Sequence, residues 1–191
     1  ASLAARQAEL HALNDELRLT SEAVARLNDM VVIARLVDTA GAQQPIIFAN
    51  DAFARRTGFA RDEVVGRGLH VLFGKHSDAS TLQRLQRAIV RKEPASAELL
   101  QITRSGEPYW VHLDMVPFAG DSGAATHWVL VGRDITEQKS AADAIHRLAF
   151  YDVLTGLPNR RLLVDRLAAL LEGADGHGAV LYVDLDNFKT I

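Results

Sequence analysis

The residues with the clearest chemical potential form the closing run of the sequence, from Asp184 to Lys189. Asp184 and Asp186 stand two positions apart, directly after the apolar segment 179–183, and Lys189 follows shortly afterwards. Carboxylates at the end of a buried strand are suitable Mg²⁺ ligands, and a nearby lysine can neutralise phosphate oxygens. This spacing therefore indicates a site for a divalent cation and a phosphate group, positioned by a strand over 179–183.

Composition limits the functions that the chain can have. Its 191 residues are 48% hydrophobic and 24% charged, as in an ordinary globular protein, and a net charge of −3 gives no reason to expect nucleic-acid binding. The sequence contains no cysteine, which excludes disulfides, thiolate metal sites and thiol nucleophiles and fits a cytoplasmic protein. The start at Ala1 and the end at Ile191 predict a segment of a longer protein. A membrane anchor is expected only if it lies in a region upstream, because no apolar stretch here approaches about 18 residues.

Residues 1 to about 30 carry a heptad pattern. One apolar row runs from Leu3 to Val24 at intervals of seven residues, and a second row at the same spacing consists of Leu13, Thr20 and Leu27. A narrow double row without Gly or Pro is typical of a coiled coil, so we expect residues 1–23 to form a dimerisation helix that pairs in parallel with a second copy. An amphipathic helix packed on its own domain is the alternative.

The segment 24–137 has the pattern of an antiparallel α+β domain. Five runs in it are strand-like: 31–37, 45–50, 95–103, 108–117 and 126–133. Between the second and third runs, short helical pieces are expected over 50–66, with Asn50 or Asp51 as a cap, and a longer amphipathic helix over 80–92. Strands grouped on either side of a helical block, rather than in strict alternation with helices, favour this class.

Five motifs within the domain occur in a specific order. They are Asn50–Phe53, Thr57–Phe59, Glu63–Arg67, Gly106–Trp110 and Gly132–Glu137. Together they resemble the ordered motifs of PAS domains over roughly residues 24–137. The resemblance implies a sensor module with a five-stranded antiparallel sheet, whose helical side encloses a ligand or is simply packed. The residues expected at such a pocket are Phe48, Leu69, Leu72, Gln101, Trp110 and Val111.

Among PAS domains the sequence is most similar to the light-sensing LOV subgroup, but it departs from the flavin-binding pattern. The segment 66–74 stands where LOV domains have Gly-Arg-Asn-Cys, and Leu69 replaces the cysteine that forms the flavin adduct. Because a leucine cannot form a thioether, covalent flavin photochemistry is excluded. Gln101 and Val111 replace the asparagines that bind the flavin ring, which leaves non-covalent flavin as a minor alternative.

Haem is a second minor alternative. His70 and His76 lie near the helical side of the expected pocket, and imidazole is a good iron ligand. A histidine among polar or loop residues is, however, more often a surface residue. The main expectation is a small apolar ligand or a packed interior, with Trp110 and Trp128 packed in the core or on a sheet face.

The segment Asp134–Thr136 resembles the motif through which PAS sheets continue into an output helix. Asp134 or Thr136 can cap that helix, and both are predicted to relay the signal. A linker helix within 138–151 is expected; over 137–150 it would extend about 21 Å and could transmit a rotation or a change in pairing. Ile145 and Leu148 would allow two copies to pair, and a passive spacer is the alternative.

The remaining segment, 152–191, carries a second resemblance. The run Asp152–Arg161 combines a Gly-Pro turn with Asn159 as a helix cap, and the run Asp184–Lys189 follows about 30 residues later. This ordered pair resembles the beginning of a GGDEF domain, a palm-like α/β domain whose complete members condense two GTP molecules into cyclic di-GMP with Mg²⁺. Asp152, Asn159 and Arg160 are expected to fix the turn rather than to contact substrate, and Asp186 is expected to be a structural carboxylate.

The resemblance assigns roles to the closing run. Asp184 and the Leu185 carbonyl would bind the metal, while Asn187, Phe188 and Lys189 would meet the triphosphate. The guanine-binding Asn and the Gly-Gly-Asp/Glu-Glu-Phe loop of the family would follow Ile191, so the 191 residues alone are expected to show no turnover. We therefore expect a PAS-regulated diguanylate cyclase that acts as a homodimer and uses GTP. The alternative is a non-enzymatic module, in which a degenerate GGDEF domain regulates a downstream cyclic di-GMP phosphodiesterase domain.

Overall fold

The structure, a computed structural model, describes residues 28–37, 44–74, 77–120, 123–172 and 179–183. The chain divides into two compact units, residues 1–139 and residues 140–191. The expected coiled coil over 1–23 and the closing run 184–191 lie outside the described residues.

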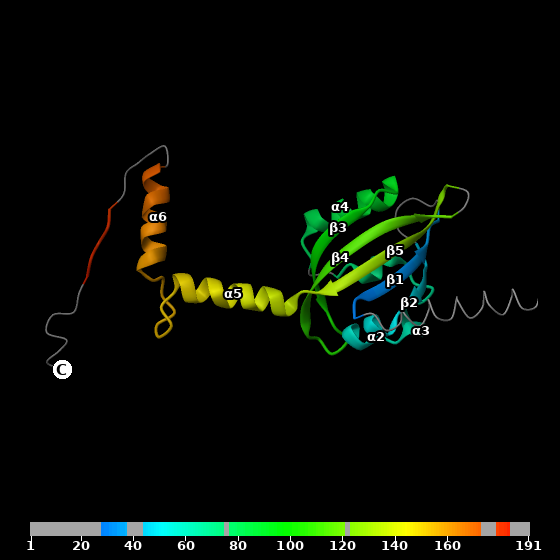
Figure 1. The fold of residues 1–191 in the computed structure, drawn as a ribbon, viewed down its shortest axis with the longest axis horizontal. Coiled ribbons are helices and arrows are strands. Elements are labelled where there is room, and N and C mark those ends of the chain that lie inside the picture. The colour runs from blue at the N-terminus through cyan, green and yellow to red at the C-terminus, as the bar shows by residue number, and fades with distance from the viewer. Residues whose placement is uncertain (1–27, 38–43, 75–76, 121–122, 173–178, 184–191) are drawn as a thin grey trace, which may run out of the picture. The chain divides into compact units, whose positions relative to one another are not determined.

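A five-stranded antiparallel sheet forms the body of the first unit (Figure 1). Its strands are β1 (Met30–Arg35), β2 (Ile46–Ala49), β3 (Ala95–Ile102), β4 (Pro108–Ala119) and β5 (Ala125–Asp134). Their order across the sheet is β2-β1-β5-β4-β3, so the first strand of the domain pairs with the last one. The five strand-like runs of the sequence are strands, which confirms the predicted antiparallel α+β domain.

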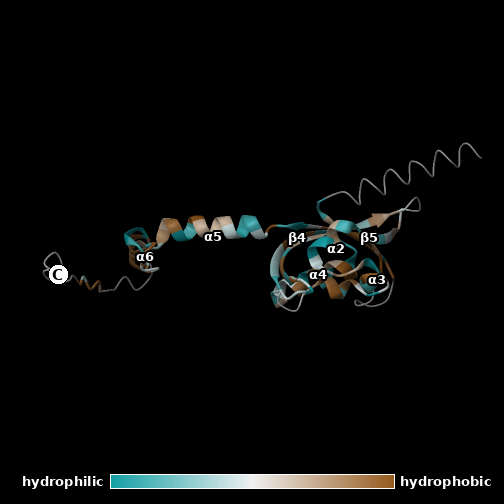
Figure 2. Ribbon diagram, turned by 90° about the horizontal axis from the view of Figure 1, so that it is seen from below, coloured by the Kyte–Doolittle hydropathy of each residue, from teal (hydrophilic) through white to brown (hydrophobic). Residues whose placement is uncertain are grey.

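Helical segments between β2 and β3 cover one face of the sheet, and Figure 2 shows the strands curving around them. They are α2 (Asp51–Thr57), α3 (Arg61–Val64), the 3-10 helix η1 (Leu69–Leu72) and α4 (Ala79–Arg91). The Asn50 side chain caps α2 by accepting the Phe53 N–H. Gly58 ends α2 at φ +77°, where a side chain would be strained. The Asp78 carboxylate caps α4 by accepting the Thr81 N–H.

The hydrophobic core lies between these helices and the inner face of the sheet. Trp128 and Leu130 of β5 are only 0% and 1% exposed, and Leu85 of α4 is fully buried. Because successive strand residues point to opposite faces, Val129 and Val131 lie on the outer face of the sheet. The core position of Trp128 agrees with its expected packing role, although its Nε1 has no hydrogen-bond partner among the described residues.

The second unit contains most of α5 and all of α6. These helices span Thr136–Phe150 and Arg160–Glu172. In the turn between them, Asp152 accepts hydrogen bonds from the Thr155 hydroxyl (2.7 Å) and N–H (2.9 Å), which lower the pKa of the Asp152 carboxyl. Asn159 accepts the Leu162 N–H at 3.1 Å and donates to the Ala149 carbonyl at 2.9 Å. The predicted turn and its helix cap are therefore present.

The expected buried strand over 179–183 needs correction. These residues have no strand geometry, and their side chains are exposed, with Tyr182 at 90%. A strand needs a partner to pair its backbone N–H and C=O groups, and none of the described strands pairs with this segment. The apolar sequence alone was therefore insufficient to predict its conformation.

Candidate functional site

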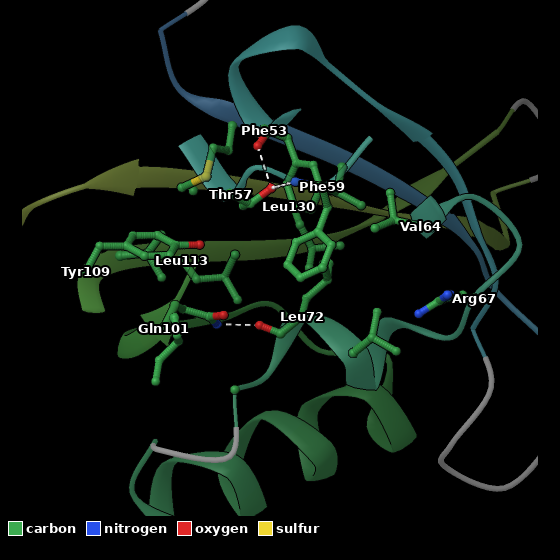
Figure 3. A pocket seen from close by; sticks show the side chains of 17 residues that line it. Phe53, Thr57, Phe59, Val64, Arg67, Leu72, Gln101, Tyr109, Leu113 and Leu130 are labelled. Carbon is green, nitrogen blue, oxygen red and sulfur yellow. Dashed lines mark hydrogen bonds between the residues drawn. The ribbon is translucent and has the colours of Figure 1, made fainter. Parts of the chain in front are cut away.

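A cavity of about 320 Å³ lies between the sheet and the helical segments of the first unit (Figure 3). Its volume is at the lower end of the range of about 300–1,000 Å³ that is usual for small-molecule sites. Side chains of β1, β4 and β5 form one wall, and residues of α2, α3 and η1 form the other. Most of the lining is apolar, and its most deeply buried members include Val32, Val111 and Leu130.

Four polar side chains also line the cavity. They are Thr57, Arg67, Gln101 and Tyr109. The Thr57 hydroxyl donates to the Phe53 carbonyl at 2.8 Å, and the Gln101 amide donates to the Leu72 carbonyl. Arg67 is an exposed residue, so its charge lies at the edge of the cavity and is solvated. Apart from Arg67, the lining residues that the structure describes carry no charged side chain.

Unlike the side chains of Thr57 and Gln101, the Tyr109 hydroxyl makes no hydrogen bond within the described part of the chain. The residue is 3% exposed, and Figure 3 shows its hydroxyl directed toward the other lining side chains. Burial raises the pKa of Tyr109 to about 12, so the hydroxyl stays protonated at neutral pH. The guanidinium carbon of Arg56 lies 4.2 Å from the centroid of the Tyr109 ring.

The structure brings together only part of the predicted pocket. Leu72, Gln101 and Val111 line the cavity. Leu69 is buried in the hydrophobic core but does not contribute to the cavity wall. Phe48 and Trp110 must be corrected, because they do not line the cavity. Each directly precedes a buried residue of its strand, Ala49 and Val111, and therefore points to the opposite face.

Tyr109 is a lining residue that the sequence interpretation missed. The signal was available, because Tyr109 precedes Val111 by two residues in a strand and must share its face. Thr57 was identified only as part of the motif Thr57–Phe59, yet its side chain lines the cavity.

The predicted ligands for metal and haem are not assembled in the described residues. His70 lies on η1, is exposed and does not line the cavity, and His76 lies outside the described residues. The described residues contain no group of three or more His, Asp or Glu that could hold a metal ion. The predicted metal and phosphate residues Asp184, Leu185, Asn187, Phe188 and Lys189 all lie outside that part of the chain.

The junction between β5 and α5 is organised by Asp134 and Thr136, the two predicted relay residues. One carboxylate oxygen of Asp134 accepts the Thr136 N–H at 2.9 Å and the Thr136 hydroxyl at 2.5 Å. The Thr136 hydroxyl in turn accepts the Trp110 N–H at 2.9 Å. The second oxygen of Asp134 pairs with Arg56. Burial tends to raise the pKa of Asp134, but the hydrogen bonds from Thr136 and Arg56 outweigh it and hold the pKa below its ordinary value.

The first turn of α5 is also attached to the sheet by Lys139. Its ammonium pairs with Glu98 of β3 at 2.6 Å and lies 5.2 Å from the centroid of the Trp110 ring. The Ile135 N–H donates to the Trp110 carbonyl at 2.9 Å. The start of the helix is thus bonded to β4 next to the cavity-lining residues Tyr109 and Val111.

Comparison with known protein families identifies both parts of the chain. Residues 28–137 match the family model for the PAS domain. The chain belongs to the PAS domain family. Residues 149–191 match the model for the diguanylate cyclase GGDEF domain, so the PAS domain is followed by a GGDEF segment.

The PAS domain is similar to domains of light receptors. It is 33% identical over 96 residues to a blue-light-activated histidine kinase of Brucella canis, a match that covers 50% of this chain and 20% of that kinase. The chain thus spans about a fifth of the length of the curated relatives it matches. The LOV domain of the Erythrobacter litoralis blue-light-activated histidine kinase superposes with a TM-score of 0.51 at 30% identity, covering 58% of this chain and 99% of that domain. An RNA-binding LOV receptor shares the fold, with a TM-score of 0.60 at 24% identity over 69% of this chain and 36% of that receptor.

The PAS domain nevertheless lacks the cysteine of the LOV adduct, because the sequence contains no cysteine at all. Leu69 stands at the expected position and is 1% exposed within the core. A covalent bond between protein sulfur and a flavin therefore cannot form here. Separately, no helix among the described residues is long and apolar enough to cross a membrane.

Proposed function

We propose that this chain is the sensory and regulatory part of a cytoplasmic diguanylate cyclase, in which the PAS domain controls the GGDEF domain through α5. The observation that carries the proposal is the hydrogen-bonded junction at Asp134 and Thr136. It joins the strands that line the cavity to the helix that leads into the segment matching GGDEF. In this proposal residues 24–137 are the sensor, 138–151 the linker and 152–191 part of the output domain.

The cavity is proposed to bind a small, mainly apolar molecule in place of a flavin. A flavin ring carries several hydrogen-bonding atoms along one edge, and each of them needs a partner when it is buried. In this cavity Thr57 and Gln101 already donate to backbone carbonyls, and the inner wall at Val111, Leu130 and Gly132 offers no polar side chain. This apolar part of the wall supports the proposal that the ligand is not a flavin. Haem lacks a histidine ligand in the described cavity wall.

The output reaction is proposed from the match to the GGDEF model over 149–191. Asp184 and the Leu185 carbonyl would hold Mg²⁺, which neutralises phosphate charge when bound, and Asn187, Phe188 and Lys189 would contact GTP. No role is proposed for nucleic acid, since the net charge is −3.

Pairing of two copies along α5 would bring two GGDEF domains together, each with one GTP. Ile145 and Leu148 support this part of the proposal, because they lie on one side of α5 and are 68% and 67% exposed. Light scattering on the chain should show a dimer that Ile145→Asp with Leu148→Asp converts to monomer. The control pair Ser140→Asp with Arg147→Asp, on the other side of the helix, should remain dimeric. A wild-type monomer at tens of micromolar would contradict pairing.

The regulatory proposal is tested by cyclic di-GMP formation from GTP and Mg²⁺, measured on the protein with its complete GGDEF domain. Coupling between two sites usually changes a rate or affinity by at least about fivefold, so Asp134→Ala should change the rate by that factor or more. The control Asp143→Ala, at an exposed position of α5, should leave the rate unchanged. An equal rate in Asp134→Ala would refute control through this junction. Complete inactivity of the wild type would favour the alternative, a degenerate GGDEF domain that regulates a phosphodiesterase.

A further inference from the structure

The unpartnered hydroxyl of Tyr109 points to the ligand chemistry of the cavity. A phenol hydroxyl that faces a cavity pairs with water or with a ligand atom, because leaving it unpaired costs free energy. Here Tyr109 is 3% exposed, lines the cavity, and has no partner for its hydroxyl within the described residues. A bound molecule with one hydrogen-bonding atom would satisfy this group.

The cavity also restricts the size and charge of that molecule. Its volume of about 320 Å³ admits a small molecule, and its inner surface is apolar. Among the described residues that line the cavity, only Arg67 is charged, and it is exposed to solvent, so an ion inside would lose hydration without a charged partner in this part of the wall. An uncharged molecule therefore matches the cavity better than an anion or a cation.

The Tyr109 ring is linked to the start of α5 by Arg56. The guanidinium lies against the ring, with its central carbon 4.2 Å from the ring centroid, and pairs with the Asp134 carboxylate. Asp134 in turn holds the Thr136 N–H and hydroxyl. Arg56 belongs to α2, and the neighbouring Thr57 lines the cavity. Arg56 therefore connects Tyr109 and α2 to the carboxylate that holds the first turn of α5.

We propose that the cavity binds a small uncharged, mainly apolar molecule whose polar atom hydrogen-bonds to the Tyr109 hydroxyl, and that Arg56 transmits this binding to the Asp134–Thr136 cap of α5. This inference rests on the proposed sensory function of the cavity and adds the ligand class and the residues of the relay. It assigns Tyr109 a binding role and Arg56 a positioning role.

The binding part can be tested on the 191-residue chain with N-phenyl-1-naphthylamine, an uncharged fluorescent dye with one N–H group. Its fluorescence should rise on binding to the wild type. Tyr109→Phe, which removes only the hydroxyl, should weaken the dye's affinity about two- to tenfold, the usual value of one hydrogen bond. Leu113→Trp, which fills the cavity, should abolish binding, and Tyr151→Phe in the second unit should have no effect.

Several results would overturn the binding part. Dye fluorescence that does not rise, or that persists in Leu113→Trp, would show that this cavity does not take such a molecule. An unchanged affinity in Tyr109→Phe would remove Tyr109 as the polar contact. Thermal unfolding of each variant identifies a change that only destabilises the fold, and Tyr109→Phe keeps the test decisive if Leu113→Trp does not fold.

The relay is tested by amide hydrogen exchange at residues 136–139, measured with and without the dye. Binding should alter exchange at this first turn of α5 in the wild type. Arg56→Gln should retain the dye but lose the change in exchange, whereas Arg55→Gln, on the exposed side of α2, should behave as the wild type. Unaltered exchange in the wild type, or a normal response in Arg56→Gln, would refute the relay. Neither measurement uses a nucleotide, so a missing cyclase activity would leave both results intact.

Discussion

Replacement of Asp134 by alanine removes the group on which the β5–α5 junction depends. The carboxylate accepts the Thr136 N–H at 2.9 Å and the Thr136 hydroxyl at 2.5 Å with one oxygen, and it pairs with Arg56 through the other. Alanine offers none of these acceptors. The Thr136 hydroxyl keeps only its contact with the Trp110 N–H.

The expected loss of stability follows from these contacts. Loss of a side-chain cap at a helix start costs about 1 kcal/mol. The ion pair with Arg56 contributes roughly 0.2–1 kcal/mol, because its side chains are 29% and 36% exposed and water screens their charges. We therefore expect Asp134→Ala to lower the free energy of unfolding by about 1–2 kcal/mol, or the melting temperature by roughly 5–8 °C for a domain of this size.

Urea unfolding followed by tryptophan fluorescence measures this change. Trp110 and Trp128 are the two tryptophans of the sequence, and both lie on strands of the PAS sheet, so the signal reports on this domain. Asp143→Ala removes another acidic residue of the same helix and should change stability by less than about 0.5 kcal/mol. Equal stabilities of Asp134→Ala and the control would refute the proposed role of the carboxylate. In a double-mutant cycle, Arg56→Ala and Asp134→Ala should be non-additive.

Three further predictions concern the pH dependence of stability at Asp134 and the helix-capping side chains of Asn50 and Asn159. The pKa of the Asp134 carboxyl in the folded protein lies below its ordinary value of about 3.9. The stability that the ionised carboxylate contributes is therefore fully present above the unfolded pKa and is lost as the pH falls through the folded pKa. In urea titrations, the difference in unfolding free energy between the wild type and Asp134→Asn should stay constant from pH 7 to about 5 and shrink below about pH 4. Asn50→Ala should lower the unfolding free energy by about 2–4 kcal/mol, because the Asn50 side chain is fully buried and accepts hydrogen bonds from the Val31 and Phe53 N–H groups, both at 3.0 Å. A decrease of less than about 0.5 kcal/mol would contradict this prediction. Asn159→Ala should speed hydrogen exchange in the first turn of α6 and leave the tryptophan-monitored transition of the PAS domain unchanged, since its contacts lie within the second unit.

Local sequence signals predicted the elements of the PAS domain well. β-branched runs and Gly-containing turns mark the strands, and Asn50 with Gly58 marks both ends of α2. These features depend on interactions between residues that are near each other in the chain, so their outcome is visible in a short window. The same reasoning correctly assigned Asn159 as a helix cap and Asp152 as a turn residue.

Signals that depend on a partner elsewhere in the chain were less informative. The apolar segment 179–183 was predicted as a buried strand, but strand formation requires a neighbouring strand, and none of the described strands pairs with it. Phe48 and Trp110 were among the residues predicted to line the pocket. Strand alternation instead turns both of them away from the cavity.

The sequence by itself determined the order of elements, the α+β class, the family resemblances and the impossibility of a cysteinyl flavin adduct, since each depends only on residue types and their spacing. The tertiary structure decided which side chains meet. Arg56, Tyr109 and Asp134 come from three different elements, and only the packing of α2 against the sheet places the guanidinium between the ring and the carboxylate. Such contacts depend on the register and curvature of the folded sheet, which are set by many weak interactions distributed over the whole domain.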